Sequence, residues 1–240
     1  MEPLTRDYFF SGRIVLTQPR SGYRFSIDSV ILAHMVRPLP NETVLDLGTG
    51  CGVIPIMLAF RYRDIHVIGV EIQPALAGLA QQNVADNRMT DRIRILHQDM
   101  VQLQRADIGG PAGLVVANPP YRRIESGRLN VDSQRAVARH ELSIDLETLL
   151  LTARRMVADS GRMAMIYPAV RTVDLLAAMR AIGLEPKNLT MIHSTSESPA
   201  RLVMVTAIRG GRPGLAVGPP LALYRKDGTY SPSIRAMFVG

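Results

Sequence analysis

The chain has 240 residues, of which 47% are hydrophobic and 20% charged, which excludes a largely disordered chain and leaves little room for two full domains. A single cysteine, Cys51, excludes an internal disulfide and a cysteine-rich zinc site, so we expect no bound metal. The start of the chain is charged, and no apolar run approaches the roughly 20 residues of a membrane helix, so we expect a cytoplasmic protein that does not bind a membrane. The formal net charge of +7 favours a polyanionic partner, although a cation set made almost wholly of arginine can also reflect genome base composition.

From Val44 onward, short β-branched runs alternate with longer helical patterns, which is typical of a parallel sheet with helices on both faces. The predicted strands are Val44–Leu47, His66–Val70, Ile93–Leu96, Leu114–Ala117, Met163–Tyr167 and Leu202–Ile208. Helical spacing covers Val53–Phe60, Pro74–Asn87 and Leu146–Val157. We therefore predict an α/β fold with a doubly wound, mostly parallel sheet. Residues 1–43 and the Pro/Gly-rich stretch 210–220 stand outside this rhythm, but neither looks like an independent domain.

A glycine-rich loop follows the first predicted strand. Its glycines occupy alternate positions: Gly48, Gly50 and Gly52, with Thr49 between the first two. Because glycine permits positive φ and close approach of a ligand, we predict a binding loop, with a purely structural turn as the alternative. The spacing departs from the dinucleotide pattern G-x-G-x-x-G, since Val53 stands where the last glycine would be. Asp46 would repel a pyrophosphate but not an ammonium or a sulfonium group, which favours S-adenosylmethionine over NAD.

Two further strand ends carry acids that suit the same ligand. Glu71 lies 21 positions after the middle glycine of the loop, where an open α/β sheet places an acceptor for ribose hydroxyls, and Ile72 follows it. A carboxylate favoured by the dipole of the helix that begins at Pro74 is the alternative. After the third strand, Asp99 could accept the adenine amine and Met100 could cover the ring, although an acid at a strand end is also a common turn former.

The fourth predicted strand runs directly into the tetrapeptide Asn118-Pro119-Pro120-Tyr121. Because the first and fourth strands flank the switch point of a doubly wound sheet, the tetrapeptide should face the glycine loop and lie against the cofactor. The prolines hold Asn118 extended, so its side-chain oxygen and the carbonyl of Pro119 can accept both hydrogens of one planar NH2 group.

This pair of acceptors predicts a specific chemistry. The lone pair of an aromatic or amide amine is delocalised, and two acceptors shift density onto the nitrogen as it becomes tetrahedral. No dedicated base is needed. Tyr121 offers a flat face on which a splayed-out base can stack. We predict methyl transfer to a planar amine with the four residues as the catalytic group, and a rigid turn with a core tyrosine is the alternative.

An arginine-rich polar segment, residues 122–141, follows the tetrapeptide. Such a loop at the edge of a ligand site is a candidate lid and phosphate contact. The candidate RNA-binding residues are Arg122, Arg123, Arg128, Arg135 and Arg139. For each of them, a solvated surface arginine is the alternative.

The same residues carry a resemblance to a known group. The motifs at 46–52, Glu71, Asp99 and 118–121 resemble those of class I methyltransferases of the Asn-Pro-Pro-Tyr group. More narrowly, four segments resemble the bacterial valine-tRNA adenine methyltransferase family: 25–32, 127–130, 138–141 and 227–231. The resemblance implies a Rossmann-like fold with a seven-stranded sheet and S-adenosylmethionine as the cofactor. It also implies methylation of the exocyclic N6 amine of the adenine next to the anticodon in one tRNA.

With this resemblance, residues 1–43 form a small N-terminal strand pair, Arg13–Thr17 with Tyr23–Phe25, and a helix from Ser29 that packs over the cofactor. They are then part of the same catalytic domain as residues 44–240, the methyltransferase domain proper. The resemblance places Phe25 and Asp28 near the methionine end of the cofactor, and a plain helix N-cap is the alternative for Asp28. A monomer is the default assembly.

Other functions remain open at this stage. A release-factor glutamine methyltransferase also acts on a planar amide, but such enzymes resemble this domain with a helical substrate domain in front, whereas only 43 residues precede the predicted sheet here. A ribosomal RNA guanine-N2 methyltransferase is a further option. DNA adenine methylation is disfavoured, because no segment is large enough for a target-recognition domain. A non-catalytic RNA chaperone would predict damage to Asn118 or to the glycines, and both are intact.

Overall fold

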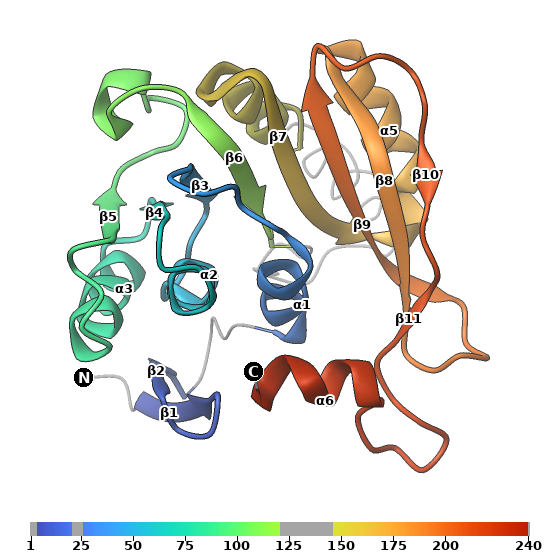
Figure 1. The fold of residues 1–240 in the computed structure, drawn as a ribbon, viewed down its shortest axis with the longest axis horizontal. Helices are drawn as coiled ribbons and strands as arrows, with labels where there is room; N and C mark the ends of the chain where they lie inside the picture. Colours follow the sequence, from blue (N-terminus) through green and yellow to red (C-terminus); the bar gives the residue numbers. More distant parts are fainter. Residues whose placement is uncertain (1–3, 21–25, 121–145, 240) are drawn as a thin grey trace, which may run out of the picture.

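A twisted, mostly parallel sheet forms the centre of the computed structural model, which describes residues 4–20, 26–120 and 146–239 (Figure 1). The long strands of this sheet are β3 (Thr43–Leu47), β4 (His66–Glu71), β5 (Ile93–His97), β6 (Ala112–Ala117), β7 (Val157–Pro168), β8 (Leu184–His193) and β9 (Ala200–Arg209). Their order across the sheet is β8-β9-β7-β6-β3-β4-β5, and only β9 runs antiparallel to its long neighbours. The predicted doubly wound, mostly parallel fold is confirmed, with the two short strands β10 (Ala216–Val217) and β11 (Leu221–Ala222) added to the seven long ones.

The strand β8 had no counterpart among the predicted strands. It contains Pro186, Lys187 and Asn188, and its pairing with β9 shifts register between Pro186 and Asn188. On its other side it pairs only with the two-residue strands β10 and β11. A strand near the edge of a sheet tolerates proline, and polar residues there hide the apolar pattern by which strands are predicted.

An antiparallel hairpin forms the start of the described chain. Its strands are β1 (Leu4–Phe9) and β2 (Ile14–Pro19). The predicted strand Arg13–Thr17 is therefore present as β2, but its described partner is β1, which the sequence analysis missed. Four of the six β1 residues are exposed or half-exposed polar or aromatic side chains, so no apolar run marks the strand. The other predicted partner, Tyr23–Phe25, lies outside the described residues.

Helices cover both faces of the sheet. One face carries α1 (Ile27–Met35), α2 (Val53–Arg61), α3 (Pro74–Asp86), α6 (Pro232–Val239) and the hairpin. The opposite face carries a helix over residues 146–156, α5 (Thr172–Ala181) and the short turns η1 (Arg105–Ile108) and η2 (Ala169–Arg171). Each layer buries its own cluster of aliphatic side chains against the sheet, which accounts for most of the favourable energy of the fold.

The hairpin is fastened to this first layer by aromatic contacts. The ring of Phe10 stacks on Phe60 of α2 with 4.5 Å between ring centroids. The ring of Phe9 stacks on Phe238 of α6 at 5.7 Å, and the Phe10 amide donates to the Phe238 carbonyl at 2.8 Å.

None of the helices in the described ranges has the length and apolar character needed to cross a membrane.

Candidate active site

The pairing of the central strands brings the two predicted motifs together. β3 pairs in parallel with β6, and Leu47 lies opposite Ala117. The next residues along the two strands are Gly48 and Asn118, so the glycine loop and the Asn-Pro-Pro segment leave the sheet at adjacent points of its carboxyl edge. β4 pairs with the other side of β3 and brings Glu71 to the same edge. Ligands of open α/β sheets bind at this kind of position.

The glycine loop has the backbone conformation that its sequence predicts. Gly48, Gly50 and Gly52 all have positive φ, at 76°, 58° and 83°. The amides of Gly48 and Thr49 both donate to the Val70 carbonyl, at 2.9 and 3.0 Å, which ties the loop to β4. A Cβ atom on Gly48 would meet nothing within 4 Å. The loop is therefore rigid and leaves open space beside its first glycine.

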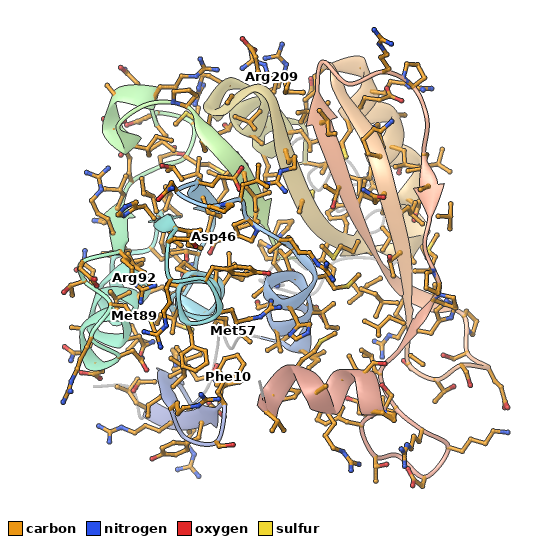
Figure 2. The ribbon with its side chains drawn as sticks, in the orientation of Figure 1. Phe10, Asp46, Met57, Met89, Arg92 and Arg209 are labelled. Atoms are coloured by element: carbon orange, nitrogen blue, oxygen red, sulfur yellow. The ribbon has the colours of Figure 1, made fainter. Side chains whose placement is uncertain are left out.

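Asp46 is a buried carboxyl group at the end of β3, in the interior of the molecule (Figure 2). Neither of its oxygens, nor the hydroxyl of the neighbouring Thr49, has a hydrogen-bond partner in the described part of the chain. Burial raises the pKa of Asp46 to about 7, the Glu71 carboxylate adds to the rise, and the nearby Thr49 hydroxyl opposes it without completing a hydrogen bond of normal geometry. Unpartnered polar atoms of this kind suit a ligand that brings positive charge or donors.

We expect Asp46→Asn to raise the free energy of unfolding near pH 8 and to leave it unchanged below about pH 4. The pKa of the carboxyl is raised from 3.8 in the unfolded chain to about 7 in the native protein, so the wild type loses stability as the pH rises through this range. At about 1.4 kcal/mol for each tenfold change in proton affinity, the loss is on the order of 4 kcal/mol. Urea denaturation at both pH values measures it, and an identical pH dependence in the variant would contradict the assignment.

Glu71 joins the glycine loop to the start of α3. Its two carboxylate oxygens accept the amides of Gly50 and Gln73, each at 2.9 Å, and Gln73 is the residue that precedes the helix. Only 5% of the residue is exposed. The carboxylate therefore occupies the helix start, as the structural alternative predicts, and it also holds the loop. Its bond to ribose hydroxyls stays a prediction.

We expect Glu71→Ala to weaken binding of S-adenosylmethionine by about tenfold or more, because charge-assisted hydrogen bonds of a carboxylate are each worth about 1.5 to 3 kcal/mol. The loss has two physical sources, since the amide of Gly50 loses its acceptor and the ligand hydroxyls lose theirs. Calorimetric titration with the cofactor measures the change. Glu71→Gln, which keeps one acceptor oxygen, should lie between the alanine variant and the wild type, and unchanged affinity in both would remove Glu71 from the site.

Asn118 is oriented by a residue from another element. Its Nδ2 atom donates to the hydroxyl oxygen of Ser29 at 2.9 Å, and Ser29 lies buried in the first turn of α1. This bond fixes which end of the amide faces α1. In the sequence, Ser29 was identified only as the start of a helix, and a serine inside the first turn rather than at the N-cap was the available signal. Pro119 and Pro120 continue from Asn118, and Tyr121 lies outside the described residues.

The remaining predicted cofactor residues lie around this edge. Asp28 is buried in the first turn of α1, but Ser26 is the N-cap residue, so the N-cap alternative for Asp28 is wrong. Asp99 accepts the amide of Val101 at 2.9 Å, as a turn former does. Met100 lines a cavity of about 160 Å³ with Pro119 and Pro120, whereas Ile72 is 60% exposed.

Several predicted residues fall outside the described part of the chain, and their roles stay predictions. They are Phe25 and Tyr121, together with Arg122, Arg123, Arg128, Arg135 and Arg139. The residues that the structure does bring together are therefore the glycine loop, the acid at the end of β4 and the Asn-Pro-Pro segment.

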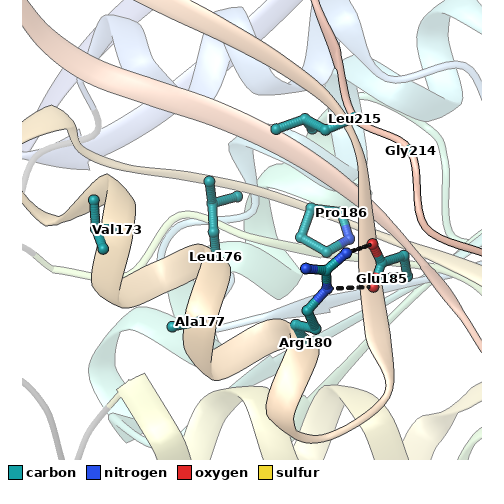
Figure 3. A pocket seen from close by; sticks show the side chains of 8 residues that line it. All are labelled: Val173, Leu176, Ala177, Arg180, Glu185, Pro186, Gly214 and Leu215. Carbon is teal, nitrogen blue, oxygen red and sulfur yellow. Dashed lines mark hydrogen bonds and ion pairs between the residues drawn. The ribbon is translucent and has the colours of Figure 1, made fainter.

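A separate cavity of about 310 Å³ lies between α5, β8 and the segment before β10 (Figure 3). The side chains of Arg180 and Glu185 form a two-bonded ion pair in its wall, at 2.7 and 2.9 Å. None of the predicted site residues lines it, and β8 is far from β3 in the strand order. We assign this cavity no part in the site.

Comparison with known proteins identifies the family to which the chain belongs. A family model described as the methyltransferase small domain matches residues 21–173. The chain belongs to this methyltransferase family. The methyltransferase is 35% identical over 205 residues to a protein of Porphyromonas gingivalis strain W83 named tRNA1(Val) (adenine(37)-N6)-methyltransferase, covering 82% of this chain and 79% of that one. A protein of the same name from Tolumonas auensis is 26% identical over 92% of this chain and 91% of its own length.

Solved structures agree with the methyltransferase fold. The structure of a predicted O-methyltransferase from Agrobacterium tumefaciens superposes with a TM-score of 0.69 at 23% identity, over 88% of this chain and 94% of that one. Geranyl diphosphate C-methyltransferase from Streptomyces coelicolor A3(2), solved with S-adenosyl-L-homocysteine, superposes with a TM-score of 0.53 at 15% identity, over 76% and 77%. These likenesses show the fold.

Proposed function

We propose that this methyltransferase uses S-adenosylmethionine to methylate the N6 amine of adenine 37 in a valine tRNA. The names and the coverage of the relatives support the proposal. The observation that carries it is the position of Asn118, next to the glycine loop at the ends of two paired strands and with its amide oriented by Ser29. A tRNA substrate also supports the expected cytoplasmic location.

The residues at the sheet edge fit the cofactor. The unpartnered carboxyl of Asp46 and hydroxyl of Thr49 suit its ammonium end, and the open space at Gly48 leaves room for a ligand against the backbone. The carboxylate of Glu71 has lone pairs beyond those used by the two amides, which suit ribose hydroxyls. When bound, the cofactor supplies an electrophilic methyl group on its sulfonium.

The protein's own contribution to the reaction is to bind and orient the amine. We infer that the Asn118 side-chain oxygen and the Pro119 carbonyl each accept one hydrogen of the adenine NH2. Both acceptors become more effective as the nitrogen turns tetrahedral and gains positive charge, so they stabilise the transition state preferentially. The hydrogen bond from Asn118 to Ser29 reduces the entropy cost of this arrangement, since the amide is already fixed.

Incubation with labelled S-adenosylmethionine and four parallel substrates tests the proposal: total tRNA, ribosomal RNA, double-stranded DNA and purified release factor. Nuclease or protease digestion and mass spectrometry then identify the methylated group. N6-methyladenosine in valine tRNA is the expected product. Methylated glutamine in the release factor, or N2-methylguanosine in ribosomal RNA, would refute the proposed substrate while keeping the assignment of a planar-amine methyltransferase.

A further inference from the structure

A second cavity opens beside the Asn-Pro-Pro segment. Its volume is about 410 Å³, and it is bounded by the start of α1, the ends of β7 and β8, the start of β9 and the segment after β11. The side chains on which the argument depends are Asp28, Pro168, Ser194, Arg201, Leu223 and Tyr224. None of the residues assigned to the glycine loop or to the end of β4 belongs to its lining, whereas Asp28, which the resemblance places near the methionine end of the cofactor, does.

Two connections place this cavity next to the amine site. Its wall residue Asp28 immediately precedes Ser29, which accepts the hydrogen bond from Asn118. Its wall residue Pro168 ends β7, the strand that pairs with β6 on the side away from β3 and continues past Asn118. The cavity is therefore close to the place where an amine would meet Asn118.

The cavity has both polar and aliphatic side chains in its walls, together with an aromatic ring. Ile192 and Leu223 are buried in its walls, and Tyr224 closes one side. The amide of Tyr224 donates to the Ser194 carbonyl at 2.8 Å, and its ring stacks on Tyr230 with 5.3 Å between centroids and 14° between planes. The ring is therefore held in place before any ligand arrives. A fixed aromatic ring beside aliphatic side chains suits the face of a nucleobase.

A cation completes the arrangement. Arg201 is the second residue of β9 and is exposed, and its side chain makes no hydrogen bond or ion pair with the residues in the described ranges. Other arginine side chains are engaged with carbonyls or carboxylates, as Arg162 is with Glu42. An exposed, unpaired guanidinium in the lining of the cavity suits a phosphate group, which it can bind through two parallel hydrogen bonds.

We propose that this cavity binds the nucleotide next to the methylated adenine, with its base against Tyr224 and its phosphate at Arg201. The inference rests on the proposed function, because it requires an RNA substrate at Asn118. It adds a specificity subsite to that function: the enzyme reads the target adenine at Asn118 and requires a stacked neighbour, so an adenine without one is a poor substrate.

A cycle of protein and RNA changes tests the subsite. The substrates are an anticodon stem-loop RNA and two copies in which the nucleotide 5′ or 3′ of the target adenine is abasic. For the wild type, one of the two abasic RNAs should have a kcat/KM about tenfold lower, since a base stacked on an aromatic side chain contributes about this much. On the intact RNA, Tyr224→Ala should lower kcat/KM by about the same factor. On that abasic RNA, Tyr224→Ala and the wild type should have the same kcat/KM.

Arg201→Ala should raise KM for the intact RNA by about fivefold, and the rise should shrink with increasing salt. The matched controls are Tyr8→Ala, which removes a ring that is 64% exposed on β1, and Arg212→Ala, which removes a cation beyond the opposite end of β9. Both controls should keep KM within twofold. Thermal unfolding and cofactor titration check that each variant is folded. If Tyr224→Ala does not fold, Arg201→Ala still tests the subsite, because the Arg201 side chain is exposed and its removal should not affect folding.

The outcomes separate this inference from the proposed function. The subsite is overturned if the loss from Tyr224→Ala multiplies with the loss from the missing base for both abasic RNAs. It is also overturned if Tyr224→Ala and Arg201→Ala are active and both have an unchanged KM. Either result leaves the proposed function standing. A wild-type enzyme that methylates no RNA refutes the proposed function, and the subsite with it.

Discussion

Replacing Asn118 by alanine is expected to lower kcat by about 100- to 1,000-fold, the usual effect of removing one preorganised group that stabilises a transition state. Affinity for S-adenosylmethionine should stay within a few-fold, because the glycine loop and Glu71 are held by their own hydrogen bonds. Single-turnover methylation of tRNA and calorimetric titration of the cofactor measure the two effects separately. An unchanged kcat would refute the assigned role of the Asn-Pro-Pro segment.

Ser29→Ala is the matched control for this experiment. It removes the hydroxyl that fixes the Asn118 amide but keeps the amide itself, so we expect a smaller fall in kcat, of about tenfold, from the lost orientation. The double variant should be no worse than Asn118→Ala alone, because Ser29 acts only through Asn118. If the kcat losses of the two single variants multiplied in the double variant, Ser29 would have a role in the site that does not depend on Asn118.

Asn83→Ala is expected to lower the free energy of unfolding by at least about 3 kcal/mol. The buried Asn83 side chain accepts the amide of Thr17 at 2.8 Å and donates to the carbonyls of Thr17 and Cys51, at 2.8 and 2.9 Å. Each buried backbone group left without a partner costs about 1 to 3 kcal/mol, and the variant creates three. Urea denaturation followed by far-UV circular dichroism measures the loss.

Asn87→Ala provides the comparison. Asn87 lies one turn further along the same helix axis and bonds the amide and carbonyl of Val15 at 3.0 and 2.7 Å, but in a half-exposed place where water can replace it. We expect a loss of about 1 kcal/mol. If both variants lost the same small amount, the buried contacts of Asn83 would not be what fixes the hairpin to the glycine loop.

These asparagines also show where sequence reasoning stopped. The strands around the glycine loop and the Asn-Pro-Pro segment were predicted because local patterns, β-branched runs and fixed turns, determine them. The partners of Asn83 lie 66 and 32 residues away in the sequence, so no local pattern reports them. A signal existed nonetheless: two asparagines four residues apart on one face of a helix are poor helix formers and suggest side chains with distant backbone partners.

The missed strands have a related cause. β1 is an exposed strand whose only described partner is β2, and β8 carries a proline and five polar residues. In both, pairing with a neighbour replaces the apolar alternation on which prediction depends. The glycine loop was easier, because positive φ at three alternating glycines leaves a signature in the sequence itself.

The stack of Phe9 on Phe238 joins residues that stand near opposite ends of the sequence. Closing so long a loop costs much chain entropy, and contacts of this kind raise the contact order of a protein and slow its folding. The neighbouring strand pairs β3·β4 and β4·β5 join segments much closer in sequence. The central sheet is thus able to nucleate first, while the seam between the hairpin and α6 closes in a late step whose rate should respond strongly to substitutions at Phe9.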